Sequence, residues 1–191
     1  MTKIKAAVRS GAMTTGWQQV GGTWYYMNSS GAMKTGWQLI GGTWYYMNGS
    51  GAMQTGWQTI GNQTYYLNES GAMATGWKLV ENVWYYFNGS GYLLKGEQTI
   101  AGTKWYLDEN TGALYTGWHY TAGKWYHHTN EGLKQTGWQF IDGTWYYMNA
   151  DGVMTTGWQQ IGGMWYYMDG SGACAFIRCR CRTDCKPFCC H

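Results

Sequence analysis

A repeat of about 20 residues constrains this chain more than any other feature of its sequence. The dipeptide Gly-Trp marks seven of the units, at Gly16-Trp17, Gly36-Trp37, Gly56-Trp57, Gly76-Trp77, Gly117-Trp118, Gly137-Trp138 and Gly157-Trp158. An eighth unit reads Gly96-Glu97 in the same place. A unit of this length cannot bury its apolar side chains alone and must stack on its neighbours. We therefore predict a solenoid whose core lies between the repeats.

Each unit has the pattern of a β-hairpin followed by a loop. In QLIGGTWYYM, β-branched and aromatic residues flank Gly41 and Gly42, which allow the positive φ of a two-residue turn. This turn pairs Trp37 with Tyr46 across the hairpin. The next segment, NGSGAMQT, is rich in turn-forming residues and predicts a loop. The expected fold is all-β, a β-solenoid of stacked β-hairpins.

Alternation of side chains gives each hairpin two faces. Trp37 and Trp44 share one face with Tyr46, whereas Ile40, Tyr45 and Met47 share the other. The second face carries a β-branched aliphatic residue in nearly every unit. We predict that this second face is the core and that the tryptophan face is partly open.

The composition excludes several classes of function. Aromatic residues make up 18% of the chain and charged residues only 12%, which is unusual for an enzyme. The net charge of +3 is small and dispersed, so nucleic acid is not an expected partner, and no apolar run could span a membrane. The histidines have no catalytic partner at motif spacing, so we expect no enzyme, no cofactor and no metal site in the repeats. Residues 1–10 lack the apolar core of a signal peptide.

Repeated tryptophans suit a cation that cannot form hydrogen bonds. A quaternary ammonium ion is attracted to aromatic ring faces, and each ring contributes about 0.5–2 kcal/mol. A cage of three rings therefore gives about 4 kcal/mol, which corresponds to millimolar affinity. Such a site becomes useful when several act on one polymer. Aromatic rings also stack on sugars, so the residues alone leave a carbohydrate ligand open.

The order GW, WYY, GAMxTGW at this period resembles the choline-binding repeats of pneumococcal autolysins, phage lysins and surface proteins. The resemblance covers residues 11–172. It implies a left-handed solenoid that binds choline or phosphocholine on cell-wall teichoic acids, outside the cell or at its wall. Related repeats bind glucans, so a glucan-binding module is an alternative. Some members dimerise through their C-terminal repeats, so a self-associating scaffold that displays a disulfide-rich peptide is another.

In the resembling family, a site combines both tryptophans of one hairpin, the methionine of the following loop and the second tyrosine of the next hairpin. The sets that match in full are Trp17, Trp24, Met33 and Tyr46; Trp37, Trp44, Met53 and Tyr66; and Trp138, Trp145, Met154 and Tyr167. A further set has leucine in place of methionine and comprises Trp77, Trp84, Leu93 and Tyr106. The resemblance thus implies three or four good choline sites.

Three other junctions depart from this pattern. Thr64 stands where a second tryptophan would join Trp57, so that cage loses a wall. Glu97 and Lys104 replace both tryptophans of another unit, where we predict no choline site. In the third junction Lys134 takes the methionine position and could repel a cation. The rings of that third junction are Trp118, Trp125 and Tyr147.

The C-terminal segment differs from the repeats in composition. All six cysteines lie in it, at Cys174, Cys179, Cys181, Cys185, Cys189 and Cys190. An even number of cysteines in a short basic segment predicts a disulfide-bonded peptide, although a thiolate metal site or a fused tail without function are alternatives. We therefore expect three parts: a leader at 1–10, the repeats at 11–172 and a cysteine-rich tail at 173–191.

Overall fold

The computed structural model describes residues 14–175, 177–178 and 186–187 of the chain. Within these ranges the chain forms strands, turns and loops, so the predicted all-β class is confirmed. No membrane-spanning helix is found among the same residues. The chain divides between Lys95 and Gly96 into two compact units, here called unit 1 and unit 2.

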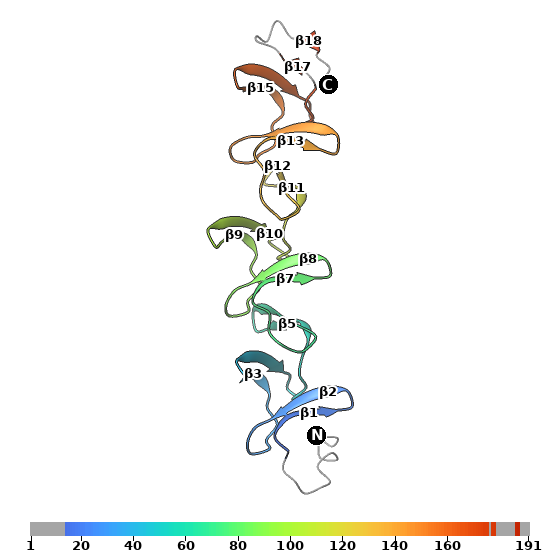
Figure 1. Ribbon diagram of the computed structural model, residues 1–191, viewed down its shortest axis with the longest axis vertical. Coiled ribbons are helices and arrows are strands. Elements are labelled where there is room, and N and C mark those ends of the chain that lie inside the picture. Colours follow the sequence, from blue (N-terminus) through green and yellow to red (C-terminus); the bar gives the residue numbers. More distant parts are fainter. Residues whose placement is uncertain (1–13, 176, 179–185, 188–191) are drawn as a thin grey trace. The chain divides into compact units, whose positions relative to one another are not determined.

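Five-residue strands in antiparallel pairs build both units (Figure 1). The strands of unit 1 are β1 (Gly16–Val20), β2 (Thr23–Met27), β3 (Gly36–Ile40), β4 (Thr43–Met47), β5 (Gly56–Ile60), β6 (Gln63–Leu67), β7 (Gly76–Val80) and β8 (Val83–Phe87). Those of unit 2 are β9 (Gly96–Ile100), β10 (Thr103–Leu107), β11 (Gly117–Thr121), β12 (Lys124–His128), β13 (Gly137–Ile141), β14 (Thr144–Met148), β15 (Gly157–Ile161) and β16 (Met164–Met168). The short strands β17 (Ile177–Arg178) and β18 (Lys186–Pro187) follow. The predicted hairpin architecture is confirmed.

The register within each hairpin is the one that the two-residue turn predicts. In β3–β4, Trp37 lies opposite Tyr46, and the other pairs follow from the turn. Gly41 and Gly42 have φ of 58° and 81°, the left-handed region that this turn requires. Each strand from β1 to β16 pairs only with its partner in the same hairpin.

The loop after each hairpin returns the chain to the hairpin before it. Asn48 begins one such loop, and its Oδ1 accepts hydrogen bonds from the backbone N–H groups of Ser50, at 2.9 Å, and Ala52, at 3.0 Å. The N–H of Met53 then donates to the carbonyl of Trp24 at 2.8 Å. Met73 makes the same bond to Trp44 at 2.9 Å. These bonds fasten consecutive hairpins of a unit into a stack, as the predicted solenoid requires.

Only part of the predicted core face is fully buried. The last residue of each second strand is buried, and these residues are Met27, Met47, Leu67, Phe87, Leu107, His128, Met148 and Met168. Ile40 and Tyr45, which we expected in the core, are only half-buried, and so is Trp37 on the other face. The reason is that the tryptophan face of one hairpin packs on the tyrosine face of the next, so both faces share the burial. The predicted left-handed winding stays a prediction.

The repeat geometry continues into the segment predicted as a tail. The N–H of Cys174 donates to the carbonyl of Trp145 at 2.8 Å, the bond that Met53 makes to Trp24. Residues 173–175 therefore occupy the loop positions of a repeat. The other five cysteines, Cys179, Cys181, Cys185, Cys189 and Cys190, lie outside the described residues, so the disulfide pairing stays a prediction.

Candidate ligand-binding junctions

A junction is here the space between two consecutive hairpins of one unit. In the first junction, between β1–β2 and β3–β4, the ring centroids of Trp17 and Trp24 are 6.3 Å apart and the planes meet at 89°. The ring of Tyr45, from the next hairpin, lies 4.8 Å from Trp17. These rings and Met53 line a hollow of about 340 Å³. Three aromatic rings and a thioether thus line one open hollow, together with Glu69 and Ser70.

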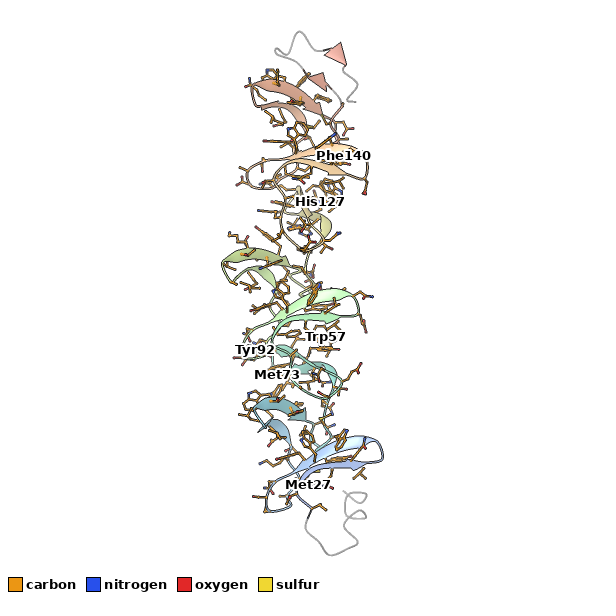
Figure 2. The ribbon with its side chains drawn as sticks, in the orientation of Figure 1. Met27, Trp57, Met73, Tyr92, His127 and Phe140 are labelled. Atoms are coloured by element: carbon orange, nitrogen blue, oxygen red, sulfur yellow. The ribbon has the colours of Figure 1, made fainter. Side chains whose placement is uncertain are left out.

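The second junction repeats this arrangement one hairpin further along. Trp37 and Trp44 lie 6.4 Å apart at 86°, and Tyr65 lies 4.7 Å from Trp37. Met73 and Tyr92 also line the hollow, which measures about 290 Å³ (Figure 2). Burial raises the pKa of Tyr65, and the neighbouring Tyr92 raises it further, so Tyr65 stays a neutral ring. Tyr92 stands where the other repeats have alanine, leucine or valine, so the repeat pattern did not predict this fourth ring.

The tyrosine of each junction is the first of its pair, not the second as predicted. Tyr45 faces back toward Trp17, whereas Tyr46 lies on the opposite face and packs 5.1 Å from Trp37 of its own hairpin. Alternation along the strand imposes this difference. The other predicted tyrosines behave in the same way against the first tryptophan of their own hairpins, namely Tyr66, Tyr147 and Tyr167.

The methionine also comes from a different loop than predicted. Met53 lines the first junction because its N–H bonds to Trp24, and the loop that carries it follows the second hairpin of the pair. Met33, the residue predicted there, does not line this hollow. The sets implied by the resemblance are therefore shifted by one loop.

Because the methionine comes from the later loop, one junction of unit 2 has two tryptophans, a tyrosine and a methionine. Trp118 and Trp125 lie 6.2 Å apart at 89°, and Tyr146 lies 4.7 Å from Trp118. The N–H of Met154 donates to the carbonyl of Trp125 at 2.8 Å. Met154, and not Lys134, thus holds the methionine position, so the expected repulsion by Lys134 does not apply to this junction.

The next junction of unit 2 has the rings but a different sulfur residue. Trp138 and Trp145 lie 6.2 Å apart at 87°, and Tyr166 lies 4.8 Å from Trp138. Cys174 makes the backbone bond to Trp145, so it takes the place predicted for Met154. The predicted tryptophan corner is present in this junction with a changed partner set.

The junction at Trp57 lacks one wall, as predicted. Tyr85 and Phe87 lie 4.8 and 5.8 Å from Trp57, but Thr64 supplies no second indole. Leu93 belongs here, because its N–H bonds to the carbonyl of Thr64 at 2.9 Å. The predicted set of Trp77, Trp84, Leu93 and Tyr106 therefore loses Leu93. Its tryptophans lie in unit 1 and Tyr106 lies in unit 2, and their combination stays a prediction.

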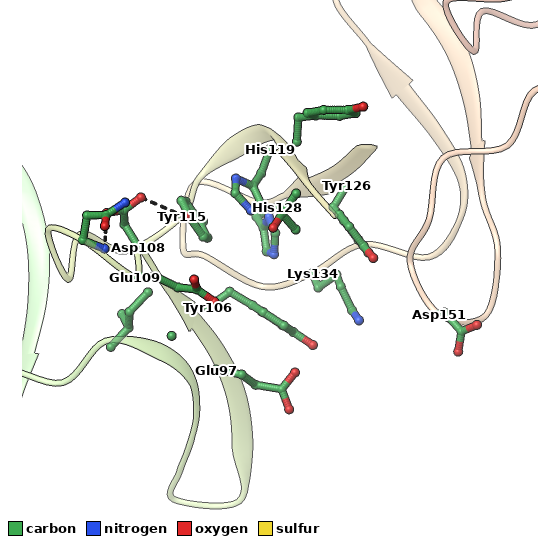
Figure 3. Close-up of a pocket in the computed structure, with 15 residues that line it drawn as sticks. Glu97, Tyr106, Asp108, Glu109, Tyr115, His119, Tyr126, His128, Lys134 and Asp151 are labelled. Carbon is green, nitrogen blue, oxygen red and sulfur yellow. Dashed lines mark hydrogen bonds between the residues drawn. The ribbon is translucent and has the colours of Figure 1, made fainter. Parts of the chain in front are cut away.

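The junction between β9–β10 and β11–β12 is polar. Glu97 and Lys104 stand in the tryptophan positions and form an ion pair, with Nζ 2.7 Å from Oε1. The hydrogen bond from Lys104 lowers the pKa of Glu97. The Nζ of Lys134 lies 5.0 Å from the ring centroid of Tyr106 and 5.8 Å from that of Tyr126 (Figure 3). Glu97, Tyr106, Tyr126 and Lys134 line a hollow of about 520 Å³.

A buried histidine lies beside this hollow. His128 is only 1% exposed, and neither ring nitrogen has a hydrogen-bond partner. Its pKa is lowered to about 4, chiefly by burial and also by the nearby His119, Lys134 and His127. The imidazole is therefore neutral at pH 7. His119 stacks on Tyr115 at 3.6 Å, and burial lowers its pKa too. No group of His, Cys, Asp and Glu in the described ranges is arranged to hold a metal ion.

Sequence comparison decides the family. The profile of the choline-binding repeat matches residues 14–55, 54–82, 74–117 and 135–175, which is most of the chain. The chain belongs to the choline-binding repeat family. The stretch 118–134, which holds His119, His128 and Lys134, is the part of the repeat region that the profile does not match. No curated protein matches the sequence of this choline-binding repeat chain.

Solved structures of choline-binding proteins share the fold. CbpJ of Streptococcus pneumoniae is 35% identical over 86% of this chain and 66% of its own, with a TM-score of 0.71. Choline-binding protein F of the same organism, solved with a peptidoglycan analogue, is 40% identical over 80% of this chain and 55% of its own, with a TM-score of 0.68. The pneumococcal autolysin LytC, in complex with a synthetic peptidoglycan ligand, is 26% identical over 84% of this chain and 42% of its own, with a TM-score of 0.54. The chain thus spans less than two thirds of the length of these proteins.

Proposed function

We propose that this chain is a non-catalytic module that holds choline or phosphocholine groups of cell-wall polymers in its aromatic junctions. The observation that carries the proposal is the right-angled tryptophan corner closed by a tyrosine of the next hairpin. A trimethylammonium group fits such a corner because it is attracted to ring faces and needs no hydrogen bond. The thioether of Met53 adds a polarisable apolar wall.

The proposed choline sites follow the observed geometry. They are Trp17, Trp24, Tyr45 and Met53; Trp37, Trp44, Tyr65 and Met73; Trp118, Trp125, Tyr146 and Met154; and Trp138, Trp145 and Tyr166. Trp77 and Trp84 are proposed as part of a further site on the resemblance alone. Each site is weak, with about millimolar affinity. Retention on a wall polymer then depends on several sites that bind together.

The membership of the family supports a location at the cell wall. Two of the similar structures carry peptidoglycan ligands, and these belong to choline-binding protein F and LytC. We propose the same surroundings for this chain. Glucan binding and pairing of two chains through the last hairpins are retained as alternative proposals. Glucan binding would give a response to glucose oligomers, and pairing would give a response to neither ligand.

The test is a titration of the purified chain with choline, followed by tryptophan fluorescence, with glucose oligomers in a parallel series. We expect a saturable change at millimolar choline and none with the sugars. Equilibrium dialysis then counts the sites, and the double variant Trp37→Ala/Trp44→Ala should lose one. Trp57→Ala is the control, because its junction already lacks a second indole. An unchanged choline count in the double variant, or a response to the sugars alone, would reject the proposal.

A further inference from the structure

The polar junction of unit 2 follows the backbone of the aromatic junctions. The backbone of Lys134 forms an isolated β-bridge with His128, the last residue of β12. Met53 forms the same β-bridge with Met47, the last residue of β4. Lys134 is therefore the residue that enters this junction in place of a methionine. Glu97 is the second residue of β9 and lies opposite Tyr106, which is the position that the first tryptophan has in the other hairpins.

The stem of Lys134 follows the path of the methionine side chain. A Cβ atom on Gly152 would come within 2.8 to 3.0 Å of Cδ, Cγ and Cε of Lys134, so the stem lies on the Cα of this glycine. Met53 lies on Gly71 in the same way in the first junction. Lys134 is half-buried, and its aliphatic stem occupies the packed position of a thioether.

The ammonium at the end of this stem lies among groups that attract a cation. The rings of Tyr106 and Tyr126 both lie within about 6 Å of Nζ, the range in which a ring face attracts a cation. The carboxylate of Glu97 lines the same hollow, and Lys134 contributes to the lowering of its pKa after Lys104. Figure 3 shows Lys134 extended between Tyr126 and Glu97.

We propose that the junction between β9–β10 and β11–β12 is an ammonium site that the chain fills itself, with Lys134 as a tethered ligand in the position that choline takes elsewhere. The class of ligand is a primary alkylammonium ion, which the ring faces of Tyr106 and Tyr126 attract. The carboxylate of Glu97 is paired with Lys104 and lines the same hollow, so it adds a more distant attraction. The junction therefore holds a cation of its own in the absence of choline, although its hollow is not smaller than those of the aromatic junctions. The comparison with choline rests on the proposed function. The position of the Lys134 ammonium does not, because it follows from the geometry alone.

Two variants separate an occupied site from a junction that merely lacks tryptophans. The double variant Glu97→Trp/Lys104→Trp restores the indoles and keeps Lys134, and the triple variant adds Lys134→Met. Equilibrium dialysis with choline counts sites per chain. We expect the double variant to bind the wild-type number and the triple variant to bind one more. An extra site in the double variant would overturn the inference, and so would the absence of an extra site in the triple variant.

A second measurement does not depend on choline. Proton NMR of the wild-type chain should show the Cε protons of Lys134 shifted upfield by the two tyrosine rings. Tyr126→Leu should reduce this shift. Protons of Lys134 at ordinary positions would overturn the inference even if the chain binds choline. A shifted Lys134 in a chain that binds no choline would reject the proposed function and leave the tethered ammonium standing.

Discussion

The first junction of unit 1 and the first junction of unit 2 share a backbone and differ in a few side chains. One hollow is lined by Trp17, Trp24 and Met53, whereas the other junction has Glu97, Lys104 and Lys134 in the same places. Both keep the tyrosine that faces back from the next hairpin, and both close a repeat with a buried residue. The comparison teaches that the stack does not need the tryptophans, so their repetition is explained by a ligand.

The largest expected effect is the loss of a whole site in unit 2. Trp118→Ala/Trp125→Ala should weaken choline binding at that junction by roughly 5- to 900-fold, because the two ring faces removed contribute about 1–4 kcal/mol together. Equilibrium dialysis should count one site fewer. Lys134→Met should leave this site unchanged, because Lys134 lies in the other junction. A changed affinity at Trp118 in the lysine variant would return Lys134 to the place that the sequence predicted.

The next effect comes from the buried histidine that replaces methionine in the core. The ordinary pKa of histidine is 6.5, and His128 has a pKa of about 4 in the folded chain. The folded state therefore binds fewer protons, and its stability is full above pH 6.5 and falls as the pH drops toward 4. Between pH 7.5 and 4.5 the free energy of unfolding should fall by roughly 2–3 kcal/mol. Urea unfolding measures this loss.

His128→Met is the matched variant for this prediction, because methionine fills the same place in β2, β4, β14 and β16. It should remove most of the acid sensitivity and leave choline binding at Trp17 and Trp24 as it was. If the variant unfolds in acid as readily as the wild type, other groups carry the effect.

A smaller effect should follow when the lysine is moved into an aromatic junction. Met53→Lys places an ammonium in the first hollow and should weaken choline binding there by about tenfold, which is about 1.4 kcal/mol. Met33→Lys is the control, because Met33 packs on Gly51 and does not line that hollow. Tryptophan fluorescence during choline titration measures both. A stronger effect at position 33 would support the set that the sequence implied.

The smallest effect should come from a single tyrosine. Tyr45→Leu removes one ring from the first junction and should weaken its affinity about fivefold, or about 1 kcal/mol. Tyr25→Leu changes the equivalent ring of β2, which lines neither of the hollows at Trp17 and Trp37, and should leave affinity unchanged. Equal losses in both variants would mean that the tyrosine acts through stability and not through the ligand.

The hairpins could be predicted from the sequence because their causes are local. A glycine pair with positive φ fixes the turn, and the turn fixes which residues lie opposite one another, so the pairing of Trp37 with Tyr46 was confirmed. Alternation then placed Trp37 and Trp44 on one face, and their ring centroids lie 6.4 Å apart on that face. The role of this tryptophan corner in binding stays a prediction.

The rest of the site depends on which loop passes beside which hairpin. Periodicity makes Tyr45 and Tyr46 equivalent candidates, and only the direction of stacking decides that Tyr45 faces Trp17. The same holds for Met33 and Met53, which differ in the hairpin that their N–H group reaches. The sequence showed only that the histidines have no catalytic partner at motif spacing, and the burial of His128 depends on neighbours that lie outside its own hairpin.

The pairing of each strand with its sequence neighbour alone has a consequence for how the chain acquires its structure. Closing a two-residue turn costs little entropy, and folds with local contacts form quickly. Each hairpin can therefore form soon after its residues leave the ribosome, and the following loop then fastens the next hairpin onto it. Growth of the stack is sequential, and repeats can be added or lost during evolution without a change in the folding route of the others.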